Sequence, residues 1–131
     1  MPETLYLRAI GTLIYLANNT RPDIVFAVNL LARCNSLPSR RYWKGIKDVV
    51  YYLRGTTDYD LFYPQEPLSN LTDFADAGYL SDPHKGRSQT GYLFSYNGTT
   101  ISWRSTKQTL TAASSNHAEI LALHEASREC Q

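Results

Sequence analysis

The stretch GYLFSYNGTTISWRS, residues 91–105, decides the fold. Aromatic and β-branched residues fill 91–96 and 99–105, and the dipeptide Asn97-Gly98 lies between them. Asn-Gly accepts the left-handed backbone of a two-residue turn and is the strongest short-range signal for a β-hairpin. The stretch therefore predicts two antiparallel strands joined by a tight turn.

Further elements of regular structure are predicted on both sides of this hairpin. Residues 71–77 predict a strand that enters a turn at Gly78, and residues 58–63 and 108–112 are shorter strand candidates. A last helix is expected after Ser114-Ser115-Asn116, and Asn116 followed by Glu119 approximates a capping box. Glu119 would then lie in the first turn of that helix.

The first third of the chain predicts three helices. In the first, apolar residues recur at helical spacing at Leu5, Ala9, Leu13 and Leu16. The second begins at Thr20-Arg21-Pro22-Asp23, since proline followed by an acid is typical of a helix start. The third runs from Pro38-Ser39 to just before Gly55, a residue suited to capping a helix C-terminus.

The third helix is amphipathic. Its apolar face holds Trp43, Ile46, Val49, Val50 and Leu53. Its opposite face holds Arg40, Arg41, Lys44, Lys47 and Arg54. Spacing alone favours a solvated outer face for these cations, and the alternative is a stripe that contacts nucleic-acid phosphates.

Length and charge suggest two regions. A chain of 131 residues forms one domain or two small ones. Its net charge is only +1, but residues 1–57 hold eight Lys or Arg against three acids, whereas residues 58–131 hold five against nine. This asymmetry suggests a basic nucleic-acid face beside an acidic site.

Several classes of protein are disfavoured. Cys34 and Cys130 lack the spacing of a zinc site or a disulfide framework, and no glycine-rich phosphate loop follows a strand. The apolar run from Leu5 to Ala17 is short and contains Arg8, so it predicts no membrane span. No secretory signal is visible, and we expect a non-secreted, intracellular protein of the cytoplasm or nucleus with no membrane partner.

Two acidic residues are candidates for chemistry. Asp76 follows an apolar strand and Glu119 starts a helix, so the two carboxylates could converge on one divalent cation. Alternatively, Asp76 forms the turn before Gly78 and Glu119 caps its helix, and spacing alone supports these roles at least as well. Asp73 alternates to the opposite face of the strand from Asp76.

Six strings, in order, resemble the polyprotein of copia-type long-terminal-repeat retrotransposons. They are TRPDI at 20–24, YLRGT at 52–56, FADA at 74–77, RSQTGY at 87–92, ISWRSTKQ at 101–108 and SSNHAE at 114–119. The resemblance covers essentially the whole chain. It implies a helical segment over 1–57 like the thumb and connection of a reverse transcriptase, and the opening of a ribonuclease H domain over 58–131.

The resemblance also implies a fold and a site. The fold class is α+β or α/β, with an incomplete ribonuclease H-like mixed sheet and a helix after the helical segment. Asp76 and Glu119 match two family residues that bind catalytic magnesium and cleave the RNA strand of an RNA–DNA hybrid. The basic stripe gains support as a surface for that hybrid.

Departures from the family limit this expectation. Gly78 and Tyr79 stand where the family often has a second Asp and a Trp, and the Tyr-x-Asp-Asp polymerase motif is absent. The family's remaining acids lie downstream of the helix that contains Glu119. We therefore expect no cleavage by this chain alone, with the C-terminal half of the domain as a possible partner, and a nucleic-acid-binding module as the alternative function.

Overall fold

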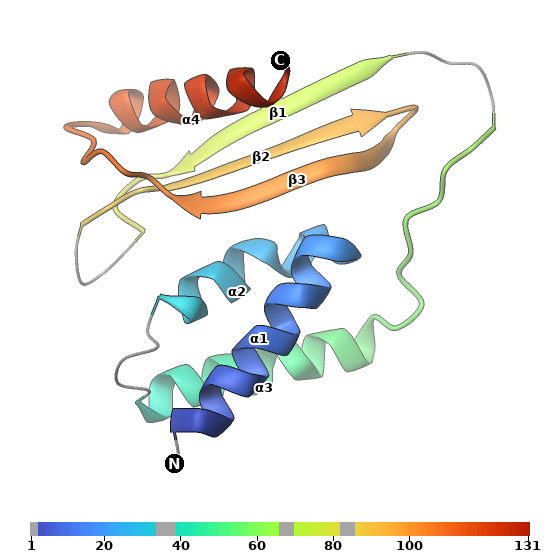
Figure 1. The fold of residues 1–131 in the computed structure, drawn as a ribbon, viewed down its shortest axis with the longest axis vertical. Helices are drawn as coiled ribbons and strands as arrows, with labels where there is room; N and C mark the ends of the chain where they lie inside the picture. Colours follow the sequence, from blue (N-terminus) through green and yellow to red (C-terminus); the bar gives the residue numbers. More distant parts are fainter. Residues whose placement is uncertain (1–2, 34–38, 66–69, 82–85) are drawn as a thin grey trace. The chain divides into compact units, whose positions relative to one another are not determined.

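A computed structural model describes residues 3–33, 39–65, 70–81 and 86–131. The chain divides into two compact units, Met1–Asp60 and Leu61–Gln131. The first contains helices and the second contains a three-stranded sheet and one helix (Figure 1). The α+β class is thus confirmed, and the family assignment of each unit stays a prediction.

The first unit holds three α-helices and one short 3-10 helix. They are α1 (Glu3–Asn19), η1 (Pro22–Ile24), α2 (Val25–Ala32) and α3 (Arg40–Gly55). The Asn19 side chain donates to the Tyr15 carbonyl oxygen at the end of α1. Pro22 then opens η1 as the sequence predicts, because its fixed φ suits the first position of a helix.

The core of the first unit gathers one face of each helix. Its buried members are Tyr6, Ile10, Leu13, Ala17, Ile24, Val28, Ile46 and Val49. The stripe predicted for α1 is confirmed at Leu13, which is buried, and wrong at Leu5, which is 47% exposed where Tyr6 is fully buried. Burial of Tyr6 is favourable because its hydroxyl donates to the Leu31 carbonyl oxygen at 2.8 Å and its ring meets Trp43 edge-on.

Two details of α3 differ from the prediction. Val50 is 49% exposed, so the buried face is narrower than expected. Gly55 is the last helical residue and does not cap the helix, because Thr56 takes that role. The Thr56 amide donates to the Leu53 carbonyl oxygen, and its hydroxyl donates to that of Tyr52 at 2.9 Å.

The second unit is built on the predicted hairpin. Strands β1 (Leu71–Gly78), β2 (Gln89–Tyr96) and β3 (Thr99–Lys107) form an antiparallel sheet in the order β1-β2-β3. Asn97 and Gly98 both have positive φ, 51° and 77°, as the tight turn requires. The described part of the sheet contains no parallel strand.

Two strand predictions are wrong. Residues 58–63 form no strand; the Phe62 carbonyl oxygen instead accepts a hydrogen bond from the Thr99 hydroxyl, and the Tyr63 hydroxyl donates to the Thr100 carbonyl oxygen. Residues 108–112 also lie outside the sheet. Gln108 makes a single backbone bond, to Ser88, and its side chain is buried.

Helix α4 (Ser115–Glu129) packs on β1 and β2 (Figure 1). It presents the small residues Ala118, Ala122 and Ala126, all fully buried. Ala126 lies in a cluster with Tyr92 and Phe94 of β2, against which Ala75 of β1 also packs. Alanines allow the helix backbone to approach the sheet closely.

The structure also bears on the two cysteines and on the prediction that the chain has no membrane span. Cys34 lies outside the described residues, and Cys130 is an exposed free thiol. In the described part of the chain, no helix has the length and apolar character needed to cross a membrane.

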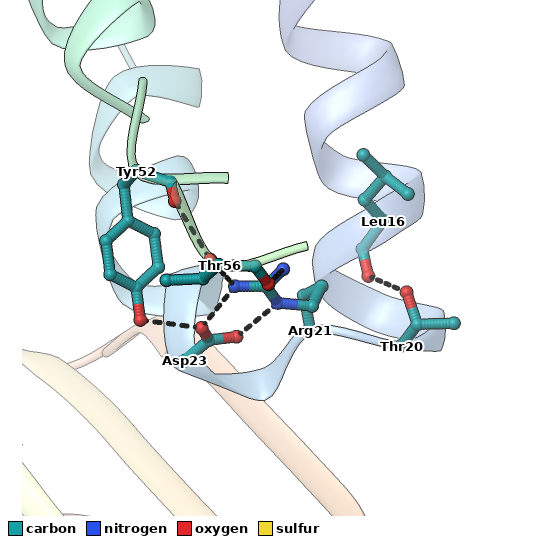
Figure 2. Close-up of polar contacts among 6 residues, drawn as sticks. All are labelled: Leu16, Thr20, Arg21, Asp23, Tyr52 and Thr56. Atoms are coloured by element: carbon teal, nitrogen blue, oxygen red, sulfur yellow. Dashed lines mark hydrogen bonds and ion pairs between the residues drawn. The ribbon is translucent and has the colours of Figure 1, made fainter. Parts of the chain in front are cut away.

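One polar network ties the end of α3 to the start of η1. Arg21 donates through Nε and Nη2 to both carboxylate oxygens of Asp23, at 3.0 and 2.8 Å, and through Nη1 and Nη2 to the carbonyl and hydroxyl oxygens of Thr56 (Figure 2). The Tyr52 hydroxyl also donates to Asp23 at 2.8 Å. The Arg21 guanidinium lies 5.7 and 5.8 Å from the ring centres of Tyr52 and Tyr59.

This network makes the stability of the first unit depend on pH. Hydrogen bonds from Arg21 hold the pKa of the Asp23 carboxyl below its ordinary value of 3.8. The ionised Asp23 carboxylate therefore contributes its full stabilisation at pH values above its ordinary pKa. That stabilisation is lost as the pH falls through the lowered pKa.

We expect Asp23→Asn to lower the free energy of unfolding of the helical unit by about 1–2 kcal/mol at pH 7, because bonds to a charged group are lost. The difference from the unaltered chain should shrink below about pH 4. Hydrogen exchange of helix amides across a pH series measures this. Asp48→Asn, at an exposed residue of α3, is the control, and a difference that ignores pH would refute the linkage.

Candidate functional site

Asp76 is a strand residue. It lies within β1 opposite Gly91 of β2, and the chain turns only at Tyr79-Leu80, where Leu80 has a φ of 52°. The interpretation of Asp76 as a turn former is therefore wrong. Its side chain is exposed and makes no hydrogen bond or ion pair within the described residues.

Alternation along β1 assigns each acid to a face of the sheet. Ala75 lies on the face that α4 covers, so Asp76 belongs to the opposite face. Asp73, paired with Phe94, belongs to the face of α4. The two aspartates therefore lie on opposite faces, as the sequence predicts.

Glu119 is not a helix cap. The N-cap of α4 is Ser114, whose hydroxyl accepts a hydrogen bond from the His117 amide at 3.2 Å, and His117 Nδ1 accepts one from the Ala113 amide. The expected capping box from Asn116 is wrong. The first turn of α4 contains no acidic residue, and Glu119 lies after that turn. Its exposed carboxylate has no partner among the described residues.

Gln108 links β2 to the start of α4. Its Nε2 donates to the Thr90 hydroxyl and to the Ala118 carbonyl oxygen, both at 3.0 Å. Thr90 pairs with Ala77, the neighbour of Asp76, and Ala118 is the neighbour of Glu119. The start of α4 and the end of β1 therefore lie at the same end of the sheet (Figure 1).

One edge of β1 is open in the described part of the sheet. In the described part of the sheet, β1 pairs only with β2, so its other edge is open. Asp76 extends from one face and Glu119 from the helix over the other.

Asp76 and Glu119 are the residues that would hold the magnesium implied by the family resemblance. Carboxylate oxygens are suitable ligands, and Asp76 and Glu119 supply two such groups. Within the described residues, however, no group of three or more acidic, histidine or cysteine side chains could hold a metal ion. Two carboxylates on their own do not make a site for a pair of magnesium ions.

The five basic candidates all lie on α3 of the first unit. Arg40, Arg41, Lys44, Lys47 and Arg54 are all exposed. Among the described residues, the only ion pair joins Arg21 and Asp23, so these cations are not neutralised by neighbours. Tyr51 lies in the same stripe and is 67% exposed, a feature that a search for charge alone overlooked.

Gln108 is the site residue that the sequence interpretation missed. It was assigned to a strand, whereas it is 1% exposed and links sheet to helix. A glutamine in an otherwise polar connection gives no sign of burial, since glutamine is usually exposed.

The chain has relatives among known proteins. It is 40% identical over 129 residues to Secreted RxLR effector protein 161 of Plasmopara viticola, covering 98% of this chain and 91% of that protein. It is 38% identical over 130 residues to the retrovirus-related Pol polyprotein from transposon TNT 1-94 of Nicotiana tabacum, and 35% identical over 128 residues to that from transposon RE2 of Arabidopsis thaliana. No family model and no solved structure matches.

These relationships define the chain as a segment related to retrotransposon Pol polyproteins. The chain belongs to the same family as the Plasmopara protein. The two Pol alignments cover 98% of this chain but 10% and 9% of the polyproteins, so the chain spans a small part of them.

We expect Gln108→Ala to destabilise the second unit by about 2–4 kcal/mol, because two buried acceptors lose their donor. Urea unfolding followed by hydrogen exchange of sheet amides measures this. Thr111→Ala, at an exposed residue of the same connection, should change stability by less than about 0.5 kcal/mol. Equal losses in both variants would contradict the linking role of Gln108.

Proposed function

We propose that the chain is the C-terminal part of a copia-type reverse transcriptase followed by the first part of its ribonuclease H domain. The observation that carries this is that the end of β1 lies at the same end of the sheet as the start of α4, because Gln108 links Ala118 to Thr90, the β2 residue that pairs with Ala77. Each of these elements bears one of the two acids that the family resemblance assigns to catalysis. Strings that are far apart in the sequence thus meet at one end of one sheet.

The local structure supports a functional role for both acids. The competing roles, turn formation by Asp76 and capping by Glu119, do not fit their positions in β1 and α4. Both carboxylates are exposed and unpaired within the described residues, so they are available to a ligand. Exposed acids that serve no visible structural purpose favour a binding or catalytic role.

The proposed activity is hydrolysis of the RNA strand of an RNA–DNA hybrid by the assembled domain. Magnesium, when bound by the complete set of acids, would supply charge stabilisation and an activated water. Asp76 and Glu119 would contribute two of its ligands. The rest must come from polypeptide with the family's further acids, so the chain alone is proposed to be inactive.

We expect the chain to cleave a labelled hybrid only after a C-terminal ribonuclease H segment of a Pol relative is added with magnesium. Asp76→Asn and Glu119→Gln should each lower that cleavage roughly a hundredfold or more, because each removes a charged ligand worth several kcal/mol. A gel assay of the labelled RNA strand measures the rate.

Asp73→Asn is the matched control, since Asp73 lies on the same strand and the opposite face. It should retain cleavage. Cleavage by the chain alone that is lost in Asp76→Asn would overturn the proposed inactivity, and no gain on complementation would count against the ribonuclease H assignment.

A second candidate function is nucleic-acid binding through α3. The observation in its favour is that five exposed cations of one helix have no ion-pair partner in the described residues. Release of counterions from a hybrid by such a surface would make binding strongly dependent on salt.

We expect Lys44→Glu to weaken binding of a short RNA–DNA hybrid and to reduce the slope of log affinity against log salt by about 0.9. Fluorescence anisotropy at several salt concentrations measures both. Arg8→Glu, an exposed change of equal charge on α1, should have a smaller effect. Equal effects of the two variants would indicate attraction by net charge alone.

A further inference from the structure

A polar groove lies between α4 and β3. Helix α4 packs on β1 and β2, so β3 at the other edge of the sheet is left uncovered on that face (Figure 1). The groove has a volume of about 390 Å³, within the range of small-ligand sites. It is separate from Asp76, which belongs to the opposite face of the sheet.

The walls of the groove are rich in cations and hydroxyls. The strand side and the segment after it supply Arg104, Thr106, Lys107 and Thr109. The helix side supplies Arg128 together with Glu125 and Glu129. Arg87 adds a further cation nearby, since its Nη1 donates to the Thr109 carbonyl oxygen at 2.9 Å.

The cations are not neutralised by the acids across the groove. In the described part of the chain, no ion pair within 4.0 Å links Arg104, Lys107 or Arg128 to Glu125 or Glu129. The three basic residues of the lining outnumber its two acids, which leaves a net positive charge in a partly enclosed space. Such a space attracts anions more strongly than an open surface does.

Tyr92 lines the groove and is 8% exposed. Burial raises the pKa of its hydroxyl, and the neighbouring Glu129 raises it further against the opposing effect of Arg104. The hydroxyl is therefore protonated at neutral pH and can donate a hydrogen bond.

We propose that this groove binds a phosphate group, held by Arg104, Lys107 and Arg128 with the hydroxyl groups of Thr106 and Thr109. Guanidinium and ammonium groups beside hydroxyls match the several acceptor oxygens of a phosphate. The phosphate could belong to a nucleic-acid backbone or to a free phosphate compound. The proposal does not require hybrid cleavage or binding by α3.

The test is a titration of the full chain with pyrophosphate, followed by amide chemical shifts in NMR. We expect saturable shifts at residues 104–109 and at the end of α4. The double variant Arg104→Gln/Lys107→Gln should weaken this binding at least tenfold. Absence of saturable shifts in the groove, or equal affinity in the double variant, would overturn the proposal.

Glu125→Gln provides a readout of opposite sign, because removal of a groove carboxylate should tighten pyrophosphate binding about twofold or more. Asp73→Asn, an acid of the same unit outside the groove lining, is its control and should leave the affinity unchanged. Weaker binding in Glu125→Gln would contradict the phosphate assignment.

A six-nucleotide single-stranded DNA then distinguishes the two sources of phosphate. Tighter binding that displaces pyrophosphate from the groove would assign the site to a nucleic-acid backbone. Pyrophosphate binding that the DNA does not displace would assign it to a free phosphate compound. Asp76→Asn or Lys44→Glu could abolish hybrid cleavage or binding by α3 and still leave the pyrophosphate-induced shifts in the groove unchanged. That result would separate the groove site from the proposed function.

Discussion

The register set by the Asn97-Gly98 turn is the constraint on which the second unit depends. Together with a register shift between Phe94 and Ser95, it pairs β2 with β3 and thereby decides which side chains of β3 share a face with Tyr92 and Phe94. A slip of one residue would move Tyr92 and Phe94 to the other face and remove the apolar surface on which Ala126 packs. The lining of the β3 groove follows from the same register, whereas the face of Asp76 follows from the pairing of β1 with β2.

Much of the fold could be predicted from local patterns. The hairpin, the strand before it and all four α-helices lie close to their predicted positions, because turn chemistry and apolar spacing act over a few residues. The errors arose where tertiary contacts decide. Tyr6 is buried in place of Leu5 because a distant carbonyl of Leu31 satisfies its hydroxyl, and Gln108 leaves the sheet because its amide bridges two elements.

The candidate site was less accessible to such reasoning. Spacing alone could not separate a ligand from a turn former or a cap at Asp76 and Glu119, and family strings were needed to single them out. The structure removes both structural roles, yet two carboxylates remain too few to hold metal within the described residues. Residues that gain importance from folding, such as Gln108 and Tyr92, carry no signal in sequence because their partners are distant.

The geometry around Arg21 also limits which residues that position accepts. Its planar guanidinium donates hydrogen bonds to Asp23 from two nitrogens and to Thr56 from two nitrogens. It also lies 5.7 and 5.8 Å from the ring centres of Tyr52 and Tyr59. Lysine would keep the charge but offers one compact ammonium in place of a rigid fork. Position 21 therefore requires the planar shape of the arginine side chain in addition to its positive charge. A substitution by lysine conserves the charge but cannot make the same set of contacts.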